Sequence, residues 1–193
     1  MDEAIKKLRA GDLVGIFPEA TISRSFEIKE FRQGAARIAY EAGAPLIPLT
    51  IWGSQRVWTK GRKPIWKPKK TELVITVGAP IEVTEDAEAT TERLHQTMVE
   101  QLDLTRERWV ERFGPMPKGE FWVPAALGGT APTLEDATVQ DRADAAARKE
   151  KRAKDKAEAE LRAATEARER AEATGINKLL VPLRQRLNHL RKK

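Results

Sequence analysis

Three short apolar runs stand out in the first 113 residues: Leu13–Phe17, Leu46–Trp52 and Leu73–Val77. Runs of this length are typical of buried strands. Pro18 directly follows the first run, and a proline there stops a strand because it has no backbone N–H to donate. We therefore predict a strand over each of the three runs.

Helical spacing of apolar residues separates and follows these runs. It occurs in residues 2–10, 31–42 and 94–113, and Gly11, Gly43 and Gly114 follow as the expected helix ends. The predicted order is helix, strand, helix, strand, strand, helix. This order predicts an α/β fold with a mostly parallel sheet flanked by helices. Three strands leave an open sheet edge and a thin core, so we expect the C-terminal half of a larger domain.

The composition changes after residue 113 and divides the chain into four segments. Residues 1–113 form the α/β unit, and residues 114–134 are a connector rich in Pro and Gly, which Phe121 and Trp122 are expected to pin onto that unit. Residues 135–174 consist almost entirely of Ala and charged residues, which predicts a solvated helix held by i,i+4 charge pairs rather than a coiled coil. Residues 175–193 form a basic amphipathic tail, with Gly175 as the predicted helix end and Pro182 as a kink or new start.

The positive charge is concentrated in two places. The net charge is +6, and residues 176–193 hold six cations and no acid, so the rest of the chain is balanced. A leucine face ringed by cations can lie on a membrane, or it can pack on its own domain or a partner helix. The second cluster, residues 56–70, has seven cations and no acid.

Tryptophans are interleaved with the cations of this second cluster. Anionic lipid attracts Lys and Arg, and Trp favours the headgroup interface, so this segment predicts a docking surface for an anionic membrane. The alternatives are stacking on single-stranded nucleic acid, which we consider unlikely, and a plain solvated loop. The expected docking residues are Trp52, Trp58, Lys60, Arg62, Lys63, Trp66 and Lys67.

Composition also excludes several kinds of chemistry. The chain has no cysteine, which rules out disulfides, thiolate metal sites and a cysteine nucleophile, and its two histidines offer little for a metal centre. We expect no metal and no prosthetic group. No apolar stretch approaches the ~20 residues of a membrane span, and the first residues lack the apolar core of a signal peptide.

The most informative stretch is the polar turn that follows the first predicted strand. It contains a carboxylate, two hydroxyls and a guanidinium at a strand's C-terminal end, where open α/β sheets bind ligands. Such a group of side chains suits a phosphate, although an ordinary polar loop has the same composition. The candidate substrate-binding residues are Phe17, Pro18, Glu19, Thr21, Ser23 and Arg24.

Three blocks of sequence around this turn resemble one family. Phe-Pro-Glu-Ala-Thr at 17–21, Phe-Arg-Gln-Gly-Ala at 31–35 and Pro-Leu-Ile-Pro-Leu at 45–49 are similar, at matching spacing, to blocks of the glycerophospholipid acyltransferases, which include 1-acylglycerol-3-phosphate acyltransferases. The resemblance covers about residues 3–83. It implies acyl transfer from acyl-CoA or acyl-carrier protein to a hydroxyl of a glycerol-phosphate lipid such as lysophosphatidate, as in phospholipid biosynthesis.

Two positions depart from the family's motif. Its glycine is Ala20 here, and its phosphate-binding arginine is Ile22. Arg24 lies two residues further on, so in an extended segment it points to the same side as residue 22. We therefore expect Arg24 to contact the acceptor phosphate, and an Arg24→Ala variant to bind the acceptor at least tenfold more weakly.

The family's catalytic pair, a His-x4-Asp motif, precedes the Phe-Pro-Glu block, and no histidine lies among the 16 residues before Phe17. His95 has Glu100 at the same offset, but five helical residues place the two on different faces. We expect His95 on a helix surface or interface and His189 in solvent, so no catalytic residue is assigned. The resemblance therefore suggests a truncated acyltransferase domain that is inactive alone.

The expected protein is a cytoplasmic, peripheral enzyme on the inner face of the cell membrane. Its expected partners are a glycerol-phosphate lipid acceptor, an acyl thioester donor and the anionic membrane surface. The alternatives are a catalytically inactive module that binds lipid headgroups and, suggested only by the charge and the Trp–Lys segment, a basic nucleic-acid binder.

Overall fold

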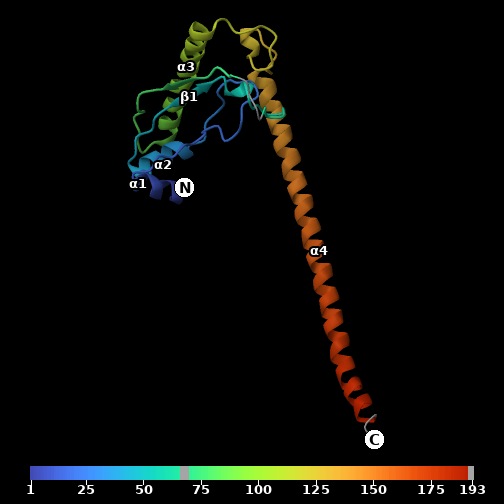
Figure 1. Cartoon of the computed structure of the whole chain (residues 1–193). Helices are drawn as coiled ribbons and strands as arrows, with labels where there is room; N and C mark the ends of the chain where they lie inside the picture. The colour runs from blue at the N-terminus through green and yellow to red at the C-terminus, as the bar shows by residue number, and fades with distance from the viewer. Residues whose placement is uncertain (66–69, 191–193) are drawn as a thin grey trace. The chain divides into compact units, whose positions relative to one another are not determined.

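The computed structural model of the chain describes residues 1–65 and 70–190, with side chains up to residue 170. The chain divides into two compact units, residues 1–139 and 140–193. The first unit is α/β, with two strands and three helices, and the fourth helix begins at its end (Figure 1). The elements are α1 (Asp2–Arg9), α2 (Gly34–Ala42), β1 (Leu49–Trp52), β2 (Val74–Val77), α3 (Ala87–Phe113) and α4 (Leu134–Leu190), with short 3₁₀ helices at Ser54–Arg56 and Ala125–Leu127.

The predicted helices of the first unit are confirmed, and their glycine ends behave as expected. Gly43 adopts the left-handed conformation after α2, with φ +65°, and Gly11 and Gly114 also have positive φ after α1 and α3. The Asp86 carboxylate begins α3, since its Oδ1 accepts from the backbone N–H groups of residues 88 and 89, both at 3.0 Å. α1 packs against α2, and α2 against α3.

The sheet differs from the prediction, because β1 and β2 pair antiparallel and not parallel. Leu49 lies opposite Val77, and Trp52 opposite Val74. A parallel pair needs a crossover that returns the chain to the same end of the sheet, usually a helix. The described part of residues 53–73 holds only one short 3₁₀ helix, so the chain turns back beside β1.

The strand predicted over Leu13–Phe17 is wrong. These residues carry no strand hydrogen bonds, and Leu13 and Phe17 are 99% and 85% exposed. An apolar run becomes a strand only when a neighbouring strand satisfies its backbone groups. No described segment pairs with residues 13–17, which explains why this apolar run does not form a strand.

The face of the sheet toward α3 combines polar with apolar side chains, whereas the opposite face is apolar. The face toward α3 carries Thr50 and Thr76, whose hydroxyls bond to the Thr105 hydroxyl of α3 at 2.7 and 2.8 Å. Gln101 of α3 also donates to the Thr76 carbonyl at 2.7 Å, so this buried polar layer is satisfied. The opposite face exposes the large apolar side chains of Leu49, Ile51, Ile75 and Val77.

A tryptophan cluster forms the core at one end of the unit. Trp52 of β1 and Trp109 of α3 pack with Trp122 and Val123 of the connector. The rings of Trp109 and Trp122 meet edge to face at 5.6 Å, and Gln55 donates to the Trp122 carbonyl at 3.4 Å. The prediction that Phe121 and Trp122 pin the connector onto the unit is therefore confirmed.

The helix predicted over residues 135–174 is present as part of α4. Charge pairs at i,i+4 run along it, for example Lys154 with Glu150 at 2.7 Å, and the side chains of residues 145–170 are exposed. α4 is helical through Gly175 and Pro182 to Leu190, so the predicted end at Gly175 is wrong. A mid-helix glycine costs only about 1 kcal/mol, which a helix of this length can tolerate. Residues 191–193 of the tail lie outside the described residues.

Candidate functional site

The candidate site is built on the turn at residues 17–25, called the motif turn below. The N–H of Ala20 donates to the carbonyl of Phe17 at 3.1 Å, which closes a tight turn around Pro18 and Glu19. The turn is fastened at its base, where the N–H of Arg32 donates to the Pro18 carbonyl at 3.0 Å. Ala20 has φ +53°, in the left-handed region that favours glycine, so the site where the family has glycine is a strained position in this chain.

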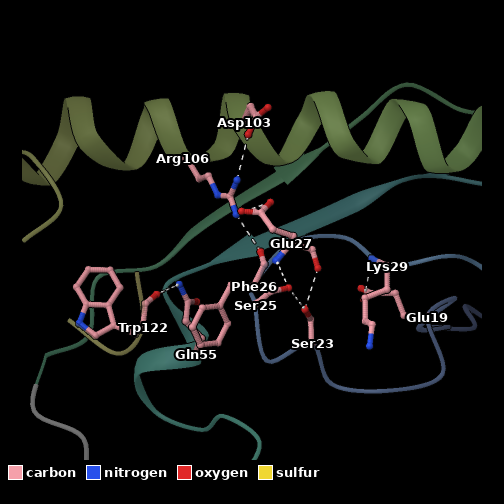
Figure 2. Close-up of polar contacts among 10 residues, drawn as sticks. All are labelled: Glu19, Ser23, Ser25, Phe26, Glu27, Lys29, Gln55, Asp103, Arg106 and Trp122. Atoms are coloured by element: carbon pink, nitrogen blue, oxygen red, sulfur yellow. Dashed lines mark hydrogen bonds and ion pairs between the residues drawn. The ribbon is translucent and has the colours of Figure 1, made fainter. Parts of the chain in front are cut away.

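Glu19 has an unusual environment for a carboxyl group. Its Oε2 accepts a hydrogen bond from the backbone N–H of Lys29 at 3.2 Å (Figure 2). Burial raises the pKa of Glu19 to about 7, more than the Lys29 N–H and the Lys29 charge lower it. Glu19 therefore exists in both protonation states near neutral pH and can accept or donate a hydrogen bond.

The following segment is organised by two serines. The Ser23 hydroxyl lies 3.0 Å from that of Ser25 and donates to the Glu27 carbonyl at 2.8 Å, and Ser25 accepts from the Glu27 N–H at 3.2 Å (Figure 2). Ser23 is thus engaged in holding the turn. Residues 24–27 are bends and not extended backbone, so the expected extended geometry around Arg24 is not found.

Arg106 of α3 is the residue that sequence reasoning missed. Its Nη2 donates to the Phe26 carbonyl at 2.9 Å and pairs with the Glu27 carboxylate at 3.1 Å, while Nη1 pairs with Asp103 at 3.1 Å. Figure 2 shows the guanidinium reaching from α3 to this segment. It also lies 4.6 Å from the ring of Trp52. The sequence held one signal for this residue, because Arg106 lies on the same helical face as the apolar residues Leu102 and Trp109.

A second loop, residues 57–65, approaches the motif turn. Lys60 Nζ lies 3.4 Å from the Thr21 hydroxyl. A Cβ added at Gly61 would lie 2.8 Å from Arg24 Nη1, so the Arg24 guanidinium rests directly on the Gly61 backbone. The structure therefore brings Thr21, Arg24 and Lys60 together, although the sequence assigned Lys60 to a separate docking surface.

The predicted docking residues do not lie on one surface. Trp52 is 2% exposed in the core and cannot contact a membrane, because the run Leu46–Trp52 points its alternate residues toward α3. Trp58 is 61% exposed and Lys63 is exposed, whereas Arg62 stacks over the Phe121 ring at 4.0 Å. Trp66 and Lys67 lie outside the described residues.

Two hollows in the described residues lie away from the motif turn, and one of them, of about 380 Å³, has Lys6 and Arg9 in its lining. The other, of about 440 Å³, lies between α2 and the start of α3, but four acidic side chains line it: Glu41, Glu85, Asp86 and Glu88. The His95 ring packs edge-on against Phe31, 5.0 Å away, as expected for a helix interface. Among the described residues no cluster of His, Asp and Glu could hold a metal ion.

Comparisons with known proteins show what the part of the chain around the motif turn is similar to. Residues 1–52 match the family model described as acyltransferase. The 1-acyl-sn-glycerol-3-phosphate acyltransferase of Bacillus subtilis is 32% identical over 99 residues, which cover 51% of this chain and 45% of that protein. The probable enzyme of the same name from Mycoplasma pneumoniae is 47% identical over 47 residues, which cover 24% of this chain and 18% of that protein.

Two further proteins to which the chain is similar are also named as acyltransferases, and the chain covers only part of each. The 1-acyl-sn-glycerol-3-phosphate acyltransferase of Borreliella burgdorferi is 33% identical over 58 residues, 30% of this chain and 23% of that protein. The crystal structure of the 1-acyl-sn-glycerophosphate (LPA) acyltransferase PlsC from Thermotoga maritima aligns with a TM-score of 0.48 at 25% identity, covering 56% of this chain and 44% of that one. The chain thus spans less than half the length of each relative.

The match to the acyltransferase family model covers residues 1–52 and so includes the whole motif turn. The relatives that this chain is similar to are named 1-acyl-sn-glycerol-3-phosphate acyltransferases. None of the helices in the described residues is long and apolar enough to cross a bilayer.

Proposed function

We propose that this chain forms the acceptor-binding part of an enzyme that transfers a fatty acyl group to a glycerol-phosphate lipid. The hydroxyl oxygen of an acceptor such as lysophosphatidate would bond to the acyl carbon of a thioester donor, acyl-CoA or acyl-carrier protein. The C–S bond would break, and the hydroxyl proton would end on the released thiol. No metal or prosthetic group takes part in this proposal.

One observation carries the proposal. The Phe17–Thr21 block folds as a tight turn with a left-handed residue at the family's glycine position, and this block lies inside the region that matches the family model. The relatives that this chain is similar to are named for 1-acyl-sn-glycerol-3-phosphate, which supports a phosphate-bearing acceptor.

The side chains of the motif turn have distinct roles in this proposal. Arg24 contacts the acceptor phosphate, because a guanidinium offers paired donors that match phosphate oxygens. The Thr21 hydroxyl donates to the same group. Glu19, whose pKa is about 7, is protonated in part of the molecules at neutral pH, and in that form it can donate to the acceptor without repelling its charge.

The base for the acceptor hydroxyl is proposed to come from outside these 193 residues. The family's His-x4-Asp pair uses the histidine as general base and the aspartate to orient it. His95 is engaged with Phe31 and is not assigned this role. A His, four residues and an Asp in the reading frame upstream of Met1 would identify the pair directly, and a frame without them would contradict this part of the proposal.

The enzyme is proposed to act from the inner face of the cell membrane, to which it binds peripherally. Trp58 and Lys63, both exposed, remain candidates for that contact. The competing function is a headgroup-binding module without catalysis, and the specific observation in its favour is that the His95 ring packs against Phe31.

The test combines binding and turnover on the purified full chain. Lysophosphatidate should bind, and acyl-CoA with lysophosphatidate should give no phosphatidate unless the upstream-encoded residues are joined to the chain. Binding without turnover in the extended protein would favour the headgroup-binding module. Turnover by the 193 residues alone would contradict an external base, and no binding at all would contradict the acceptor site.

A further inference from the structure

Lys60 contacts the motif turn from a segment that the family model does not match. The matched region ends at residue 52, eight positions before Lys60. Lys60 Nζ nevertheless lies 3.4 Å from the Thr21 hydroxyl, across 39 residues of sequence. The contact therefore depends on how the 57–65 loop folds.

That loop has its own fixed geometry. Its base is closed by the Ile65 N–H, which donates to the Val57 carbonyl at 2.9 Å, and a turn is closed by the Arg62 N–H on the Thr59 carbonyl at 3.3 Å. Thr59 is 6% exposed, and Arg62 is stacked on Phe121. The turn is thus anchored on both sides of Lys60, which directs this side chain toward Thr21.

Gly61 allows the second cation to come close. Its φ is +81°, and its missing side chain leaves the space in which Arg24 Nη1 lies. Arg24 comes from the motif turn and Lys60 from the 57–65 loop, and consecutive residues of that loop contact Thr21 and Arg24. A phosphate bound at the Thr21 hydroxyl would be attracted by the charge of Lys60 beside it and by that of Arg24, which contacts the next residue of the loop.

We propose that Lys60 binds the acceptor phosphate together with Arg24, so that the phosphate is held between the motif turn and the 57–65 loop. This proposal rests on the proposed function of the motif turn. The planar guanidinium supplies directed hydrogen bonds, and the ammonium supplies a compact charge with three donors. The ligand class is a phosphate monoester of a glycerol lipid, represented in solution by glycerol 3-phosphate.

The test is calorimetric titration of the full chain with glycerol 3-phosphate at constant ionic strength. Lys60→Gln should weaken binding roughly tenfold, since a hydrogen bond to a charged group is lost. Lys60→Arg should retain most of the affinity. The matched control is Lys63→Gln, which makes the same charge change three residues away on an exposed side chain and should change the affinity less than about twofold.

The outcomes separate this proposal from the proposed function. Equal weakening by Lys60→Gln and Lys63→Gln, with a large loss in Arg24→Gln, would overturn the role of Lys60 and leave the acceptor site standing. No loss in Arg24→Gln, or no saturable binding by the unaltered chain, would overturn both. Inorganic phosphate should bind more weakly than glycerol 3-phosphate, and equal binding would overturn the assignment to a lipid acceptor.

Discussion

Ala20 shows how a single residue can carry strain at a functional turn. Its φ of +53° is costly for a residue with a Cβ, by about 1 kcal/mol. Ala20→Gly should therefore raise the free energy of unfolding by up to about that amount, measured by urea denaturation. Ala10→Gly is the control, because Ala10 has an ordinary φ of −81° and glycine should bring no gain there. Equal effects at both positions would contradict the strain at Ala20.

Glu19 gives the chain a defined pH dependence. Its pKa is about 7 in the folded chain and 4.5 when unperturbed, so the folded state binds more protons between these values. Stability should therefore fall as pH rises from 4.5 to 7, by at most about 3 kcal/mol, and level off above 7. Glu19→Gln should remove this fall and be more stable than the unaltered chain at pH 8. Unfolding midpoints at pH 5 and 8 measure the difference, and parallel curves for both proteins would contradict the raised pKa.

At the scale of elements, α3 holds the segment after the motif turn through Arg106. Only 10% of the Arg106 side chain is exposed, and its removal would leave Glu27 and the Phe26 carbonyl without their partner. Arg106→Ala should cost about 2–4 kcal/mol of unfolding free energy. Arg93→Ala is the control on the same helix, because its pair with Glu82 is 41% and 78% exposed and should cost less than about 1 kcal/mol. Similar losses for both variants, measured by urea denaturation, would contradict the anchoring role.

Helices and their ends could be predicted where the sequence pattern depends only on residues close together in the chain. The glycines after α1, α2 and α3 and the periodicity of residues 94–113 depend on the chain's own backbone preferences, and these predictions hold. The strand at Leu13–Phe17 and the parallel pairing failed because both depend on which segment lies alongside, and spacing carries no such information.

The candidate site was predictable in part for the same reason. The motif turn was recognised from residue types and spacing. Lys60 contacts the motif turn across 39 residues of sequence, and Arg106 contacts the segment after it across 80, so only folding reveals them. Trp52 was misassigned because tryptophan suits both a membrane interface and a core, and its burial is set by α3 and the connector.

For the whole molecule, the net charge of +6 leads to a prediction about partners. The full chain should bind vesicles that contain anionic lipid more tightly than neutral ones, and this binding should weaken as salt rises. An oligonucleotide at equal charge concentration should bind less well. Co-sedimentation at two salt concentrations measures both, and a preference for the oligonucleotide would favour the nucleic-acid alternative over a lipid-linked function.

The most direct measurement of the central claim is NMR mapping of glycerol 3-phosphate on the isotopically labelled full chain. The account predicts that the largest amide shift changes fall in residues 17–25 and around Lys60, and that they disappear in Arg24→Gln. Shift changes confined to the acidic hollow between α2 and α3, with the motif turn unaffected, would contradict it.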